Sequence, residues 1–142
     1  MNALIEKFNQ VVSHADFAKL LLRLGFGGMF LLHGIAKMLH GVDGIIVRLT
    51  NAGLPEFVAY GSYLGELVAP ILIVIGLFTR ASAFVCVMTS LFIVYLVHIV
   101  DQGNLFALSK VGGWAVEPIG TFLFGFLAIM FLGSGKYAVK AD

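Results

Sequence analysis

The sequence predicts an all-α integral membrane protein, a bundle of four transmembrane helices with both termini on the cytoplasmic side. Hydrophobic residues make up 60% of the chain and charged residues only 12%. This charged fraction is about half of what is usual in soluble domains. Four apolar stretches recur at about 17–39, 57–78, 81–100 and 117–132, and the first three reach the ~20 residues that a helix needs to cross a bilayer. The connecting segments are short, so residues 1–142 are expected to form one domain.

Composition also limits the classes of function. The net charge of +1 gives no basic field of the kind that binds nucleic acid, so no nucleic-acid partner is expected. Cys86 is the single cysteine, which excludes an intramolecular disulfide and a CxxC redox pair. A self-contained thiol–disulfide enzyme is therefore not indicated. The first apolar stretch is too long, and begins too late, for the hydrophobic region of a signal peptide.

The first apolar stretch, residues 17–39, carries the ionisable side chains Arg23, His33 and Lys37. An ionisable side chain inside a membrane helix costs about 2.5 kcal/mol or more, so it normally faces protein or water. His33 and Lys37 lie one helical turn apart. At 100° per residue, Arg23 lies within about 40° of the same face. We therefore expect the rest of the chain to supply partners for these side chains.

Two short amphipathic helices are predicted outside the spans, within residues 2–15 and 40–56. Each segment has apolar residues at helical spacing with polar residues between them. The apolar positions are Leu4, Ile5, Phe8, Val11 and Val12 in the first segment, and Val42, Ile45, Ile46 and Leu49 in the second. Helices with one apolar face typically lie on the membrane surface. A frayed terminus is the alternative for the first segment.

The second span has a carboxyl group near its middle. Glu66 lies within residues 57–78, and Pro70 follows four positions later. Because proline has no amide hydrogen, the carbonyl of Glu66 loses its helical partner, and a kink is expected there. Thr79 and Arg80 form a very short turn, which predicts an antiparallel hairpin with the third span.

The fourth apolar stretch, residues 117–132, is short for a span, and a start at Trp114 is the alternative. Orientation follows from the positive-inside rule. With the N-terminus inside, one side of the membrane holds Lys7, Lys19, Arg80, Lys136 and Lys140, and the other holds Lys37, Arg48 and Lys110. The larger group of cations favours both termini in the cytoplasm.

This topology places unusual polar residues from every span between the middle of the membrane and its outer face. Arg23 lies further toward the cytoplasmic side. We hypothesise a polar pocket in which Glu66 or His33 exchanges a proton and Lys37 stabilises charge. The candidate pocket residues are Arg23, His33, Lys37, Glu66, His98 and Glu117. The alternative is structural. Glu66 would then pair with Lys37 or Arg23 to fix helix packing, and His98 and Glu117 would lie at the membrane interface.

Some of these side chains are types that could bind a transition metal, namely His33, His98, Glu66 and Glu117. No HxxxH or ExxH pair supports a metal site locally, so no metal is expected. A haem with His33 and His98 as its axial ligands is a further chemical alternative.

Several motifs appear in a fixed order across nearly the whole chain. They are RLGFGGMFLLHGIAK (23–37), GLP (53–55), YLGELVAPILIVIGLFTRASA (63–83), His98, GGWAVEP (112–118) and GSGKYA (133–138). Taken together, they resemble the DoxX family of small membrane proteins. The resemblance implies a four-helix bundle in the bacterial inner membrane. It also implies polar positions at Arg23, His33, Lys37, Glu66, Arg80, His98 and Glu117. Some members of that family are associated with quinone-linked and oxidative-stress redox complexes, and many have no assigned activity.

The first hypothesis is an accessory subunit of a quinone-linked membrane redox system. Electrons would come from a partner protein, because the chain has no cofactor motif of its own. The second is a non-enzymatic membrane scaffold, or a protein that binds a lipid or small ligand. Transport of a small solute is a third, for which four helices offer little room unless the protein is a homo-oligomer.

Overall fold

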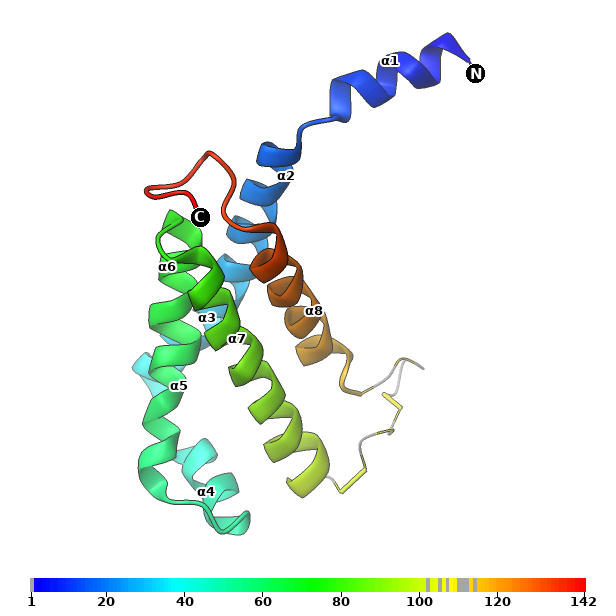
Figure 1. The fold of residues 1–142 in the computed structure, drawn as a ribbon. Helices are drawn as coiled ribbons and strands as arrows, with labels where there is room; N and C mark the ends of the chain where they lie inside the picture. Colours follow the sequence, from blue (N-terminus) through cyan, green and yellow to red (C-terminus); the bar gives the residue numbers. More distant parts are fainter. Residues whose placement is uncertain (1, 102, 105, 107, 110–112, 114) are drawn as a thin grey trace.

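The computed structural model describes residues 2–101, 103–104, 106, 108–109, 113 and 115–142 (Figure 1). Every regular element in this part of the chain is a helix, so the predicted all-helical class is confirmed. Lys110 and Trp114, which entered the predicted topology, lie outside the described residues.

The N-terminal helix α1 (Ala3–Val12) begins where the side chain of Asn2 accepts a hydrogen bond from the amide of Leu4, at 2.9 Å. Such a cap satisfies one of the amides that a helix start leaves unpaired. All residues of α1 are exposed, including Leu4 and Phe8 on its apolar face. In Figure 1, α1 projects away from the remaining helices.

The first long helix, Ala15–His40, consists of α2 (Ala15–Leu22), a π-helical turn η1 (Arg23–Gly27) and α3 (Gly28–His40). It ends at Gly41, whose φ of 83° is a conformation that favours glycine. The chain then bends by 97° into α4 (Asp43–Asn51). Leu49 of α4, and Val42 directly before the helix, pack onto Ala59 and Leu96 in a small second core.

The next helix runs through η2 (Glu56–Tyr60), α5 (Gly61–Tyr63), η3 (Leu64–Val68) and α6 (Ala69–Ile75). Where a kink was predicted near Glu66, the structure has the π-helical turn η3, and Pro70 stands in the first turn of α6. Gly76, in the left-handed conformation with φ 79°, ends α6. The turn to α7 (Thr79–Ile93) is therefore at residues 76–78. Thr79 and Arg80, predicted as the turn, begin α7 instead.

Two helices are long and apolar enough to cross a membrane among the described residues, Glu56–Ile75 and Thr79–Ile99, the second reaching into η4 (Val94–Asp101). The bent pair of Ala15–His40 and Asp43–Asn51 makes a third candidate span. Helix α8 (Glu117–Leu132) is apolar but has only 16 residues. Large apolar side chains on the outer surface, such as Leu32, Phe124 and Phe131, are exposed, as expected of a protein that contacts lipid.

The main core lies where the long helices meet. Its buried members are Phe30, Ala69, Ile73, Ala83, Cys86, Val87, Phe126 and Ile129. Helix α8 packs alongside α7 (Figure 1), and a side chain at Gly125 would press against the ring of Phe26. Packing through such small residues is typical of membrane helices, because it lets the backbones approach closely.

Residues 133–142 have no regular secondary structure and lie across one end of the bundle (Figure 1). The guanidinium of Arg23 donates hydrogen bonds to the carbonyls of Ser134, at 3.1 Å, and Tyr137, at 2.5 Å. The amides of Val139 and Lys140 donate to the carbonyls of Ile75 and Gly76, both at 3.1 Å. We call this segment the C-terminal strap.

Candidate functional site

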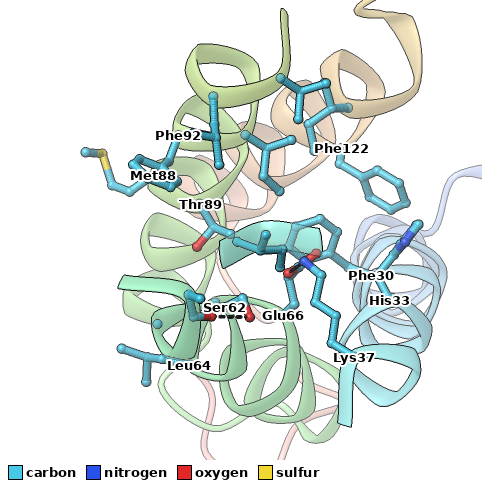
Figure 2. A pocket seen from close by; sticks show the side chains of 18 of the residues that line it. Phe30, His33, Lys37, Ser62, Leu64, Glu66, Met88, Thr89, Phe92 and Phe122 are labelled. Carbon is cyan, nitrogen blue, oxygen red and sulfur yellow. Dashed lines mark hydrogen bonds and ion pairs between the residues drawn. The ribbon is translucent and has the colours of Figure 1, made fainter. Parts of the chain in front are cut away.

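A pocket of about 570 Å³ opens between α3, η3, α7 and the start of α8 (Figure 2). Its volume lies within the range of roughly 300–1,000 Å³ of small-molecule sites. Apolar side chains form most of its wall, including Phe30, Leu64, Phe84, Met88, Phe92, Leu96 and Phe122. The polar lining residues are His33, Lys37, Arg48, Ser62, Glu66 and Thr89. Such a pocket suits an apolar ligand with a small polar head.

An ion pair lies in the pocket wall. The ammonium of Lys37 on α3 donates a hydrogen bond to Glu66 Oε2 on η3, as Figure 2 shows. The side chain of Lys37 is 23% exposed and that of Glu66 only 4%. The carboxylate is therefore the more deeply buried partner, and it depends more strongly on the pair for its charge to be compensated.

The backbones of α3 and η3 approach each other closely beside this pair. A side chain at Gly34, one turn before Lys37, would collide with the carbonyl oxygen of Glu66. This carbonyl is the one that Pro70 deprives of its helical partner. Glycine at position 34 therefore sets the distance at which Lys37 can reach across to Glu66.

Aromatic rings line the wall on the α3 and α8 side. The ring of His33 stands edge-on to Phe30 and Phe122, with centroids 6.3 and 5.9 Å apart. Phe30 and Phe122 lie 5.0 Å apart. Ring pairs at these separations attract each other. Phe30 is buried beneath the other two rings, so the rings that a planar ligand could contact are those of His33 and Phe122. His33 belongs to this aromatic wall and faces the same pocket as the ion pair (Figure 2).

Two hydroxyl groups complete the polar lining. Ser62 donates to the carbonyl of Ala59 and Thr89 to that of Val85, each at 2.8 Å. Because their hydrogens are engaged within their own helices, both oxygens offer lone pairs to a ligand. A side chain at Gly65 would collide with the hydroxyl of Thr89, so glycine is required where η3 meets α7.

The predicted site residues separate into two groups. His33, Lys37 and Glu66 line the pocket together, whereas Arg23, His98 and Glu117 are not among its described lining residues. Arg23 is 1% exposed and donates to four carbonyls, those of Ile73 and Val74, each at 2.9 Å, and the two in the C-terminal strap. His98 is buried in η4. Glu117 begins α8, where the next two residues, Pro118 and Ile119, do line the pocket.

Arg48 on α4 lines the pocket, although sequence reasoning used it only to count charges. The available signal was its spacing. Ile45 and Arg48 are one turn apart on a predicted amphipathic helix, and both face the pocket. Among the described residues, no three His, Cys, Asp or Glu side chains gather closely enough to hold a metal ion. The polar groups that line the pocket are the ion pair, the imidazole, two hydroxyls and the guanidinium of Arg48.

The amino-acid sequence is similar to those of known proteins and to one family model. A protein of Haemophilus influenzae described as uncharacterized is 30% identical over 131 residues, which cover 92% of this chain and 94% of that protein. A Bacillus subtilis protein named "Putative oxidoreductase CatD" is 38% identical over 65 residues, 46% of this chain and 48% of that protein. No solved structure matches. The DoxX family model matches residues 18–99, which include the ion pair, His33 and most of the pocket wall, and the chain is therefore a member of the DoxX family.

Proposed function

We propose that this protein is an accessory subunit of a membrane redox system and binds a quinone in the pocket. The observation that carries the proposal is the Lys37–Glu66 ion pair set in an otherwise largely apolar, aromatic-walled pocket. A quinone is a flat, apolar ring with oxygens that gain electrons and protons on reduction. The rings of Phe122 and His33, which are not buried, suit its faces, and the polar groups suit its oxygens.

The residues would divide the work of a reduction. The ammonium of Lys37 would donate a hydrogen bond to a quinone oxygen and stabilise the negative charge that develops on it as electrons arrive. Glu66 or His33 would deliver and replace the proton that this oxygen takes up. The electrons would come from a partner protein that docks on the membrane domain. In oxidation of the reduced quinone, the same groups would accept the proton.

The comparisons support a redox role only through a name. The Bacillus subtilis relative carries the word oxidoreductase in its name, and it aligns with less than half of this chain. The aligned family region nevertheless includes Lys37 and Glu66, so the proposal depends on those residues rather than on the name.

We further propose that four helices cross the bacterial inner membrane with both termini in the cytoplasm. The start of α2, the turn at residues 76–78 and the C-terminal strap lie at one end of the bundle (Figure 1). That end carries Lys19, Arg80, Lys136 and Lys140, as the positive-inside rule requires of the cytoplasmic face. Helix α1, with its exposed apolar face, would lie in the headgroup layer there.

The test is to purify the protein in mild detergent and measure quinone in a solvent extract by mass spectrometry, then to titrate depleted protein with added quinone. We expect about one quinone per protein, and a loss of binding of tenfold or more in Lys37→Met and Glu66→Gln variants. Glu117→Gln removes a carboxylate outside the pocket and should bind as the wild type does. A folded wild-type protein that neither retains nor rebinds quinone would refute the proposal.

A non-enzymatic scaffold or lipid-binding role is the second candidate, and one observation favours it. Lys37 and Glu66 satisfy each other without any ligand, as two residues that only fix helix packing would. In that case the Lys37→Met and Glu66→Gln variants would lose stability while a coupled redox activity in native membranes stayed unchanged. A lipid found by mass spectrometry in place of quinone would support this second role.

A further inference from the structure

A second hollow of about 170 Å³ runs along the surface between η3–α6 and α7. It exists because residues on the two facing helices are small. Ala69 on one side, and Ala81 and Ser82 on the other, leave a trough where larger side chains would interdigitate. Ala69 and Ser82 are buried and form its floor, while Val68 and Phe78 are exposed at its rims. We call this trough the α6–α7 furrow.

The furrow adjoins the main pocket. Leu64 and Val85 line both hollows. On the η3–α6 side the furrow extends from Leu64 to Leu72, which at a rise of 1.5 Å per residue is about 12 Å. Its rim residues Leu64, Val68 and Phe78 are 57%, 45% and 58% exposed, and they lie in the apolar, lipid-facing surface. A molecule in the pocket can therefore extend along the furrow without leaving apolar surroundings.

We infer that the α6–α7 furrow holds the apolar tail of a ligand whose polar head occupies the pocket. The ligand class is then an amphiphile with a long aliphatic or isoprenoid chain, and not a compact water-soluble quinone. This inference rests on the proposed function for the head group. One feature supports a tail over an unrelated bilayer chain: Leu64 and Val85 line both hollows. The furrow also gives the ligand a lateral route from the bilayer.

The test compares two ligands that share a head group, a benzoquinone without a side chain and the same ring with a decyl chain, at one fixed detergent concentration. Ala81 is exposed, so Ala81→Leu fills the furrow without entering the core, and Val68→Phe fills it from the other helix. Ala18 is exposed on α2 and lines neither hollow, so Ala18→Leu is the matched control. Far-ultraviolet circular dichroism checks that each variant is folded.

The wild type should bind the decyl compound more tightly than the compound without a chain. Ala81→Leu and Val68→Phe should weaken the decyl compound about tenfold, as expected for displacing about two methylene groups, and should leave the other compound unchanged. Equal weakening of both compounds, or of neither, would overturn the inference. Failure of both compounds to bind even the wild type would instead count against the proposed function, so the two failures are distinguishable.

Discussion

The Lys37–Glu66 ion pair gives the sharpest prediction, because its two partners are unequally buried. Lys37→Met leaves the carboxylate of Glu66, 4% exposed, without its counter-charge. Breaking a buried pair in this way typically costs about 3–5 kcal/mol. Glu66→Gln instead leaves the ammonium of Lys37, which is 23% exposed and has a long, flexible stem that can turn its charge toward water. That change should cost about 1–2 kcal/mol.

The double variant should be more stable than Lys37→Met alone, since it removes the uncompensated carboxylate. Two charges at about 4 Å interact by about 4 kcal/mol at an effective dielectric of 20, and desolvation and partial exposure reduce the expected coupling to about 1–3 kcal/mol. The free energies of unfolding come from titration with sodium dodecyl sulfate in mixed micelles, followed by far-ultraviolet circular dichroism. Single variants of equal stability whose effects simply add would refute the reasoning.

Three further predictions concern other parts of the structure. Arg23→Met leaves four carbonyls without their donor and should destabilise the protein by about 3 kcal/mol or more. Trypsin should then cut faster after Lys136, because the C-terminal strap is released. A cleavage rate equal to that of the wild type would contradict this prediction. Gly34→Leu should separate α3 from η3 and abolish quinone binding, while Gly28→Leu, where a side chain meets no atom within 4 Å, should not; binding titration decides. Phe8→Glu should weaken binding of a peptide of residues 1–14 to phospholipid vesicles several-fold, and unchanged binding in a flotation assay would rule out a surface role for α1.

Helical periodicity predicted which residues of α3 face the pocket, but it did not predict where Arg23 binds. His33 and Lys37 lie one turn apart within regular α3, so their shared face follows from spacing, and both line the pocket. The spacing of 100° per residue predicts that Arg23 lies near the same face, and the contacts agree. Arg23 donates to the carbonyls of Ile73 and Val74 on α6, and Lys37 donates to Glu66 on η3 of the same long helix. The two cations differ in position along the axis, because 14 residues at 1.5 Å each separate them by about 21 Å, so Arg23 meets the C-terminal strap and not the pocket.

Features that depend on long-range contacts were out of reach of pattern reasoning. The left-handed conformation of Gly76, and not the polar Thr79-Arg80 pair, ends α6. Arg48 reaches the pocket only because the chain bends by 97° between α3 and α4. The furrow likewise depends on Ala69 facing Ala81 and Ser82 across two helices. A single sequence indicates the size of each side chain but does not show which side chains meet.

The contacts of Arg23 have a consequence for how the protein is made. The carbonyls of Ser134 and Tyr137 that it binds lie 111 and 114 residues further along the chain. At about 5–20 residues per second, the ribosome takes roughly 6–23 s to reach them after it has added Arg23. The carbonyls of Ile73 and Val74, which Arg23 also binds, lie only 50 and 51 residues further along the chain, so they are synthesised first. The hydrogen bonds of Arg23 are therefore completed in two stages, first by α6 and later by the C-terminal strap.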